Sequence, residues 1–318
     1  MVAAGTMPTV LFAAGSPMAQ GKRIGIIGLD TSHSVAFTKA LNAESPDPEL
    51  RAYRIVAAYP YGSKTIESSA SRIPGYVEEV KKFDVKIVDS VESLLSQVDY
   101  VMLETNDGRP HLEQAMKVIK AGKPIFIDKP VAASWKDVRA IYEAAHRAGV
   151  PIFSSSSLRY METVQAAING KVGRVLGADT YSPATLEPHH PDFFWYGIHG
   201  IEMLVALMGT GCKQVSRIYT EGTDIVIGVW QDGRVGTFRG TRTGKHTYGG
   251  TAYGENGDLT LGPYNGYDAL VKEIIKFFDS GKSPVDEKET MEIYAIMVGA
   301  DESKKSNGAV IQLRDILV

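Results

Sequence analysis

The most informative chemical group in the chain is a lysine that follows a short apolar run. Residues 124–127 have the composition of a buried strand, and Asp128, Lys129 and Pro130 come directly after them. In an open parallel sheet, the carboxyl ends of the strands face the ligand crevice. We therefore expect Lys129 to extend its cation toward a bound molecule, and Pro130 to stiffen the turn that carries it.

The stretch before Lys129 supplies elements that can position it. Tyr100–Leu103 form a short apolar run suited to a strand that is covered on both faces. Apolar side chains then recur at helical spacing from 112 to 119, and Gly122 stands where a left-handed residue would end a helix. The segment predicts a strand, a polar loop, a helix and a second strand that leads into Lys129.

The overall composition limits the possible functions. The chain has 318 residues, of which 44% are hydrophobic, and a formal charge of −3, which predicts two domains with sizeable cores. It has no basic run that would indicate nucleic-acid binding, and no apolar stretch of the roughly 20 residues that a membrane span needs. The one cysteine, Cys212, excludes an internal disulfide framework and a cysteine-cluster metal site.

The first 21 residues differ from the rest of the chain. They are small and apolar, with a short hydrophobic centre at residues 10–14, but no Lys or Arg precedes that centre. This is the pattern of a secretory leader without its positive charge. A cytoplasmic location and export to the periplasm are both left open, and residues 1–21 are treated as a leader-like or disordered segment.

The order of the predicted elements divides the remaining chain in two. From 22 to 154, strands and helices alternate, which predicts an α/β domain with a doubly wound parallel sheet. From 155 to 318 they no longer alternate strictly, which predicts an α+β domain with a largely antiparallel sheet. In the second domain we expect strands at 172–181, 214–220, 225–230 and 235–241, and helices at 161–169, 199–208, 267–278 and 288–305.

Three short motifs point to a family. They are TNDGRPH at 105–111, AGK at 121–123 and DKP at 128–130. They resemble the Thr-Pro-Asn-x-x-His loop, the Ala-Gly-Lys helix end and the Glu-Lys-Pro turn of the glucose-fructose oxidoreductase / inositol dehydrogenase / rhizopine-catabolism (Gfo/Idh/MocA) family. The resemblance implies a Rossmann-type dinucleotide-binding domain, a nicotinamide cofactor, and a second domain for substrate binding. The exposed sheet face of that second domain commonly supports a homo-oligomer in this family, here a dimer or tetramer.

The loop that should bind the cofactor phosphates departs from the expected pattern. A GxGxxG sequence usually lies between the first strand and the first helix, but this chain reads GLDTSH there and keeps only Gly28. Asp30 replaces a glycine that lets the backbone approach the pyrophosphate, and its charge would repel phosphate. Thr31, Ser32 and His33 could compensate by donating hydrogen bonds. Alternatively, Thr31 or Ser32 simply caps the helix.

The adenosine side of the cofactor site is also unusual. An acidic residue normally holds the ribose of NAD, but residues 59–64 (YPYGSK) contain no carboxylate. Ser63 and Lys64 could accept a 2′-phosphate, which favours NADP over NAD, although an ordinary solvated loop also explains them. The resemblance assigns the nicotinamide side of the site to Thr105, Asn106, His111, Asp128 and Lys129. His111 could equally be a structural residue at a helix start.

A second motif, DFFWYGIHGIE, lies at residues 192–202. The resembling family has Asp-x-Gly-x-His-x-x-Asp here, and alignment puts Trp195 at the first Asp and Glu202 at the last. The resemblance therefore implies that His199 takes the hydroxyl proton of a substrate, a role that suits an imidazole. Lys129 would orient that hydroxyl and stabilise negative charge on its oxygen.

Further substrate contacts are expected around this motif. Trp195 could offer a stacking face to a sugar, and Tyr196 lies beside it. Glu202 could contact substrate or position the imidazole, although a helix-surface carboxylate is the simpler interpretation. Arg159 and Tyr160 follow the sixth strand near the crevice, or belong to a polar connector between domains. No metal site is expected, because the adjacent histidines at 189–190 are typical of a loop.

These observations leave three functions open. The leading hypothesis is an NAD(P)-dependent oxidoreductase that acts on a sugar, cyclitol or related polyol by hydride transfer. The second is an NAD-dependent glycosidase-like hydrolase, in which a tightly held cofactor oxidises and then re-reduces the sugar. The third is a non-catalytic carbohydrate-binding protein that has lost its dinucleotide site, as Asp30, Trp195 and the missing ribose carboxylate indicate. Taken alone, His199 could be a buried structural histidine at a helix start, and Lys129 a surface turn lysine.

Overall fold

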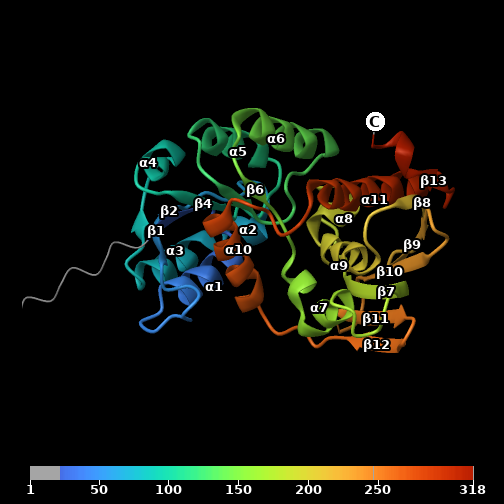
Figure 1. Cartoon of the computed structure of the whole chain (residues 1–318). Coiled ribbons are helices and arrows are strands. Elements are labelled where there is room, and N and C mark those ends of the chain that lie inside the picture. The colour runs from blue at the N-terminus through green and yellow to red at the C-terminus, as the bar shows by residue number, and fades with distance from the viewer. Residues whose placement is uncertain (1–21, 246, 318) are drawn as a thin grey trace, which may run out of the picture.

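Two sheets form the framework of the molecule, one near each end (Figure 1). The computed structural model describes residues 22–245 and 247–317, so the leader-like segment 1–21 lies outside the described residues. Within that part of the chain, every helix falls short of the length or the apolarity that a bilayer crossing requires.

The first sheet has six parallel strands in the order β3-β2-β1-β4-β5-β6. Its strands are β1 (Lys22–Ile27), β2 (Tyr53–Tyr59), β3 (Lys86–Ile87), β4 (Tyr100–Leu103), β5 (Ile125–Ile127) and β6 (Ile152–Phe153). This arrangement confirms the predicted doubly wound parallel sheet.

Helices cover both faces of this sheet, α1, α3 and α10 on one side and α4, α5 and α6 on the other (Figure 1). Side chains in the strands alternate accordingly: in β4, Val101 and Leu103 join one buried cluster and Met102 joins the other. The helices are α1 (Ser32–Leu41), α2 (Glu67–Ala70), α3 (Ile73–Lys81), α4 (Val91–Leu95), α5 (His111–Lys120), α6 (Trp135–Ala148) and α10 (Asp268–Ser280).

Local signals set the ends of several of these helices. The side chains of Ser90 and Ser134 accept hydrogen bonds from backbone N–H groups in the first turns of α4 and α6. Helix α6 ends at Gly149, whose φ of 64° is a left-handed conformation that favours glycine.

Helix α10 comes from the second half of the chain but packs on the first sheet. Its Leu270, Ile274 and Phe277 are buried in one cluster with Phe126 and Phe153. The first core is therefore completed by residues from both sides of the predicted domain boundary at 154/155.

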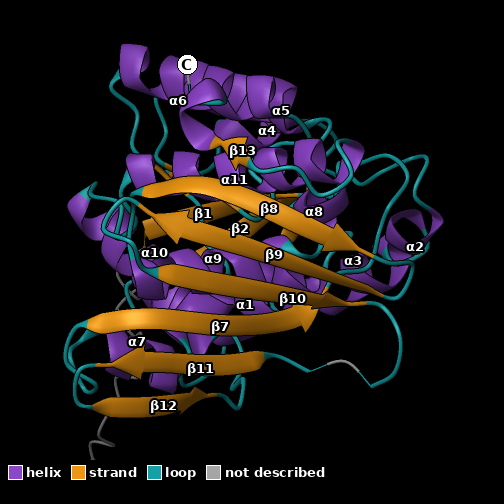
Figure 2. Ribbon diagram, turned by 90° about the vertical axis from the view of Figure 1, so that its right-hand side faces the viewer, coloured by secondary structure: helices purple, strands orange, loops and turns teal. Residues whose placement is uncertain are grey.

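The second sheet has seven strands in the order β12-β11-β7-β10-β9-β8-β13, and only the β7–β10 pair is parallel. Its strands are β7 (Val175–Pro183), β8 (Cys212–Tyr219), β9 (Thr223–Trp230), β10 (Val235–Thr241), β11 (Gly249–Gly254), β12 (Gly257–Leu261) and β13 (Ile311–Gln312). The largely antiparallel sheet is confirmed, although β11, β12 and β13 were not predicted. Figure 2 looks onto the face of this sheet that is left open by every helix in residues 22–245 and 247–317.

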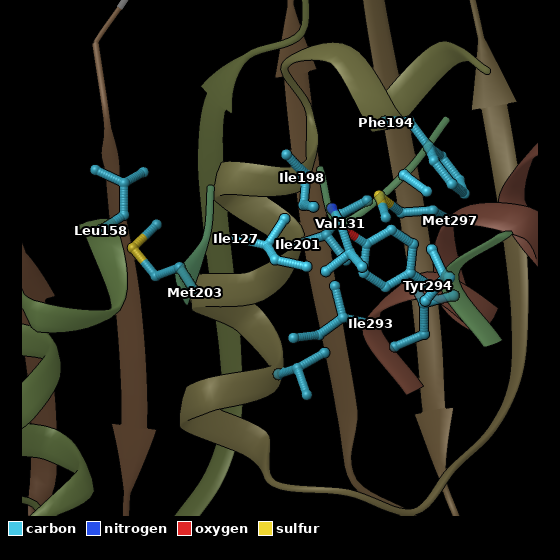
Figure 3. Packing of buried hydrophobic residues seen from close by; sticks show 14 of the residues in the cluster. Ile127, Val131, Leu158, Phe194, Ile198, Ile201, Met203, Ile293, Tyr294 and Met297 are labelled. Carbon is cyan, nitrogen blue, oxygen red and sulfur yellow. The ribbon is translucent and has the colours of Figure 1, made fainter. Parts of the chain in front are cut away.

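Helices α9 (Ile198–Met208) and α11 (Glu287–Lys305) cover the inner face of the second sheet and join the two halves of the molecule. Ile201 of α9 and Ile293 and Tyr294 of α11 pack against Val131, which follows the first sheet (Figure 3). The backbone N–H of Val131 donates a 2.6 Å hydrogen bond to the Tyr294 hydroxyl. The other elements of this half are η1 (Ser157–Tyr160), α7 (Glu162–Ile168), α8 (Asp192–Trp195) and η2 (Leu313–Asp315).

Candidate active site

A cavity of about 520 Å³ lies at the carboxyl ends of the parallel strands, between the first sheet and the second half of the molecule. This is the position at which open α/β sheets bind ligands. The cavity is lined by Thr31, Ser32, His33, Ser68, Arg72, Tyr76, Asn106, Lys129, Ser157, Leu158, Thr185, Trp195, Tyr196, His199, Tyr248, Tyr264 and Tyr267.

Lys129 lies in the cavity wall directly after β5. Its side chain is largely buried, and its ammonium forms no hydrogen bond or ion pair with the residues that the structure describes. A buried cation without a partner is costly unless a ligand contacts it. The surface-turn interpretation of Lys129 is therefore wrong, because the residue is only 6% exposed.

His199 lies in the first turn of α9 and lines the same cavity. Its Nδ1 is 2.7 Å from the Ser156 hydroxyl, and its ring contacts Tyr196 edge to face. Burial lowers the pKa of His199 well below 6.5, and the charge of Lys129 lowers it further. The imidazole is therefore neutral at physiological pH, and Nε2 can accept a proton in the tautomer whose Nδ1–H donates to Ser156.

Glu202 and Arg159 form a buried pair beneath His199 and do not line the cavity. The Glu202 carboxylate accepts hydrogen bonds from the Ser155 hydroxyl (2.5 Å), the Ser156 backbone N–H (2.8 Å) and Arg159 Nε (3.0 Å). Glu202 is 3% exposed, so the interpretation as a helix-surface carboxylate is wrong. The pair fixes the segment whose Ser156 contacts His199. Tyr160, the next residue after Arg159, also lies outside the cavity lining.

Asp30 is turned into the protein and does not face the cavity. Its carboxylate accepts hydrogen bonds from the backbone N–H groups of Asn106 (3.0 Å) and Ser63 (3.2 Å), and the residue is fully buried. Burial raises its pKa to about 6. Asp30 therefore connects the loops after β1, β2 and β4. Because its carboxylate does not line the cavity, it does not face a bound phosphate there.

The other residues of the GLDTSH loop cap α1, line the cavity or pack against the backbone after β4. The Thr31 hydroxyl accepts from the backbone N–H of His33 and caps α1, as the capping interpretation predicted. Ser32 keeps an exposed side chain at the cavity. His33 also lines the cavity, and its Nδ1 is 2.8 Å from the Asp128 carboxylate. Gly28 has a φ of 102°, and a Cβ there would lie 2.3 Å from the backbone nitrogen of Thr105.

Six of the predicted cofactor residues lie outside the cavity lining: Gly28, Asp30 and Asp128, and three others that hold loops in place. The Ser63 hydroxyl accepts from the backbone N–H of Ile66 (3.1 Å), and the Thr105 hydroxyl donates to the side chain of Gln114 (3.0 Å). Both ring nitrogens of His111 contact backbone carbonyls, those of Thr105 and Val131. Of the loop after β4, only Asn106 lines the cavity.

Sequence reasoning missed much of the cavity wall. Ser68, Arg72 and Tyr76 come from the segment after β2, where no helix was predicted and no motif singles them out. The Tyr196 hydroxyl forms a 2.7 Å hydrogen bond with that of Tyr248. Tyrosines 264 and 267 extend this aromatic wall. Aromatic faces and hydroxyls of this kind suit a ligand with both apolar and polar surfaces, such as a sugar ring.

His190 anchors the segment that leads into α8, the helix that ends at Trp195. Its Nε2 accepts a 3.0 Å hydrogen bond from the backbone N–H of Gly108, and its ring packs 4.9 Å from that of Trp195. Burial lowers the pKa of His190 to about 4. Its neighbour His189 is more exposed and pairs with Glu187, so the two adjacent histidines do not form one site.

The fold and the cavity define a Rossmann-type protein with a second, mixed-sheet domain. Residues 22–156 match the model of the Gfo/Idh/MocA family, described as an oxidoreductase family with an NAD-binding Rossmann fold. The match covers the segment that forms the parallel sheet, so this part of the chain is similar to the family in sequence.

Similarity to individual relatives is partial in sequence and extensive in structure. The chain is 34% identical to 1,5-anhydro-D-fructose reductase of Ensifer adhaerens over 110 residues, 33% of each chain. It is 28% identical to inositol 2-dehydrogenase 2 of Saccharopolyspora erythraea over 123 residues, 36% of each chain. It thus spans about a third of the length of these curated relatives.

Solved structures share the whole fold. A scyllo-inositol dehydrogenase from Lactobacillus casei with bound NAD(H) and scyllo-inositol superposes with a TM-score of 0.75 and 15% identity, over 93% of this chain and 100% of that one. A myo-inositol 2-dehydrogenase from Lactobacillus plantarum gives a TM-score of 0.75 and 15% identity, over 92% of this chain and 99% of that one. At this identity the likeness shows the fold.

Proposed function

We propose that this protein is a nicotinamide-dependent oxidoreductase that acts on a sugar, cyclitol or related polyol by hydride transfer. The observation that carries the proposal is the shared position of Lys129 and His199. An ammonium without a partner and a neutral imidazole line one cavity at the ends of the parallel strands. The names of the sequence relatives, a sugar reductase and inositol dehydrogenases, support the substrate class.

The cavity residues fit a dinucleotide despite the altered loop. Ser32 and the first turn of α1 can meet phosphate oxygens, because helix N-termini attract anions. Arg72, Ser68 and Tyr76 come from the segment after β2, which borders the adenosine ribose in this fold. A guanidinium there favours NADP, because it can pair with a 2′-phosphate. This supports the predicted preference for NADP, with Arg72 in place of Ser63 and Lys64.

The protein's own groups would manage the proton and the charge on oxygen. The bound nicotinamide supplies the hydride acceptor for alcohol oxidation. His199 takes the hydroxyl proton on Nε2, because Nδ1 is engaged by Ser156. The ammonium of Lys129 stabilises the developing negative charge on the substrate oxygen. Trp195 and the tyrosines at 196, 248 and 264 surround the substrate ring and exclude water.

Calorimetric titration of nucleotide-free protein with NADP(H) and NAD(H) tests this proposal. We expect one nucleotide per chain, with tighter binding of NADP(H). A screen of sugars and cyclitols would then follow nicotinamide absorbance, and substrate-dependent reduction is the expected result. Absence of binding by all four nucleotides at millimolar concentration would overturn the proposal.

A further inference from the structure

A cluster of three ionisable side chains lies directly behind the cavity wall. Glu104 follows β4, Asp128 follows β5, and His33 lies in the first turn of the helix after β1. Each residue offers a ligand atom, and these atoms lie within 4.8 Å of one another. The three strands are neighbours in the sheet, which brings together residues that are far apart in the chain.

The cluster contains carboxylate oxygens without hydrogen-bond partners. Glu104 is fully buried, and neither of its oxygens has a partner among the described residues. Asp128 is 1% exposed, and its Oδ1 also lacks a partner, whereas its Oδ2 contacts His33 Nδ1 at 2.8 Å. Buried acceptors left unpaired are costly, and two adjacent buried carboxylates repel each other. These oxygens therefore require a positively charged or hydrogen-bearing partner.

We propose that His33, Glu104 and Asp128 bind one divalent first-row transition cation, of the class of Zn²⁺ or Mn²⁺. Two carboxylates and one imidazole are a suitable ligand set for such ions. With metal–ligand bonds of about 2.0–2.2 Å, neighbouring ligand atoms lie roughly 3–4 Å apart, so modest side-chain adjustment closes the site. The cation neutralises the two carboxylates and satisfies the oxygens that have no other partner.

The surroundings fix the imidazole and leave a path to the cavity. The ring of His33 packs against Phe37 (5.7 Å between centroids) and Tyr267 (4.6 Å). His33 and Lys129 both line the cavity, so a cation held by His33 is reached from it and can take a water or a substrate oxygen as a further ligand. The ammonium of Lys129 repels a cation bound at the cluster. Cation binding therefore requires the carboxylates of Glu104 and Asp128 to be ionised.

The test is a titration of chelator-treated full-length protein with ZnCl₂ and with MnCl₂, followed by calorimetry and native mass spectrometry. We expect one cation per chain in the wild type. Glu104→Gln and Asp128→Asn keep the side-chain shape and remove a charge, and each should weaken binding at least tenfold. His189→Ala is the matched control. It also removes a histidine that pairs with a carboxylate, since His189 lies 2.6 Å from Glu187, but this pair lies outside the cluster. The control should leave cation binding unchanged.

The wild-type titration alone can overturn the proposal. If neither ion binds with defined stoichiometry at micromolar concentration, Glu104 is protonated and the cluster holds no cation. Cation binding that survives unchanged in well-folded Glu104→Gln, as judged by circular dichroism, would also overturn it. Cation binding is independent of oxidoreductase activity, and nucleotide binding by the same sample is measured separately.

Discussion

Lys129 and His199 divide the proposed chemistry between them at the scale of single residues. The side chain of Lys129 lies largely buried in the cavity wall, while burial lowers the pKa of His199 and keeps its imidazole neutral. A fixed cation favours negative charge on a substrate oxygen, and a neutral imidazole can accept the proton that leaves it.

Replacement of Lys129 by methionine should remove this charge with little change in volume. We expect kcat to fall roughly 10²- to 10³-fold, because a preorganised group that stabilises charge is lost. Lys123→Met is the matched control, since Lys123 precedes β5 on the same segment but does not line the cavity. Steady-state kinetics with a substrate from the screen make the comparison, and equal activity of both variants would exclude the role of Lys129.

The lowered pKa of His199 predicts a pH profile for the reaction. A general base with an ordinary pKa of 6.5 would lose activity as the pH falls through 6.5. Because the pKa of His199 is lowered, its base form persists and kcat/KM should stay level down to about pH 6. His199→Gln should abolish turnover. A wild-type profile that declines with a midpoint at or above pH 6.5 would contradict this assignment.

Arg72 should determine cofactor affinity at the adenosine end. Arg72→Ala should weaken NADP(H) binding about tenfold or more, equivalent to roughly 1.4 kcal/mol, through loss of a charge-assisted contact. The sequence suggested Lys64 for this role, but Lys64 does not line the cavity. Lys64→Ala should therefore have little effect on NADP(H) affinity. Calorimetry on both variants tests the choice between them, and a larger loss in Lys64→Ala would show that Arg72 is the wrong residue.

At the scale of elements, irregular segments hold the cavity together by contacts between distant loops. Asp30 joins the loops after β1, β2 and β4, and Glu202 joins α9 to the connector at Ser155 and Ser156. His190 links the segment before α8 to the loop after β4. Each link is a buried polar group whose loss would leave hydrogen-bonding atoms unpaired.

The buried His190 should make stability depend on pH. The unfolded chain takes up a proton with a pKa near 6.5, whereas the folded protein does so only near 4, so the unfolded state binds more protons between these values. This contribution to the free energy of unfolding is present above pH 6.5 and decreases as the pH falls toward 4. It amounts to about 2 kcal/mol between pH 7 and pH 5.

Chemical denaturation at pH 7 and pH 5 measures this effect. His190→Gln should lose less stability than the wild type on acidification, because the amide does not titrate. His189→Gln changes the more exposed neighbour and should behave like the wild type. An identical fall in the wild type and in His190→Gln would mean that His190 does not carry the pH dependence.

At the scale of the whole molecule, the sequence predicted what depends on local pattern. Short-range patterns indicated the strand Tyr100–Leu103, the helix after it and the N-cap at Ser134. The alternation of such strands and helices predicted the parallel sheet. Burial of Lys129 and Glu202 was not predictable in the same way, because it depends on segments that approach from elsewhere in the chain.

Long-range packing also explains what the sequence could not predict at the site. Helix α10 returns to the first sheet, and Tyr248, Tyr264 and Tyr267 reach the cavity from irregular segments without a recognisable motif. A single polar residue after a strand, such as Glu104, is common and does not by itself indicate a site. Asp128 and His33 lie beside Glu104 because β1, β4 and β5 are neighbours in the sheet. Partners of this kind depend on strand order, which the spacing of residues does not specify.

The uncovered face of the second sheet is where we expect two copies of the chain to meet. Ile218, Val235, Tyr253 and Tyr181 are 38–61% exposed on the strands of this sheet. Apolar side chains grouped on one face commonly mark a protein–protein interface. The predicted homo-oligomer would bury this surface.

Light scattering after size-exclusion chromatography tests the oligomer. The wild type should have the mass of a dimer or tetramer, and Ile218→Lys should shift it toward the monomer by burying an unpaired charge. Met116→Lys is the control, because Met116 is 41% exposed on α5 in the first half of the molecule. A monomeric wild type would exclude this use of the face.

Native mass spectrometry of the purified wild-type protein shows whether the cavity holds a nucleotide. If the cavity is a dinucleotide site, the protein should carry one NADP(H) or NAD(H) per chain, either retained from purification or after incubation with millimolar nucleotide. Arg72→Ala treated in the same way should carry less NADP(H) than the wild type. Wild-type protein that shows only its own mass under both conditions would contradict the account.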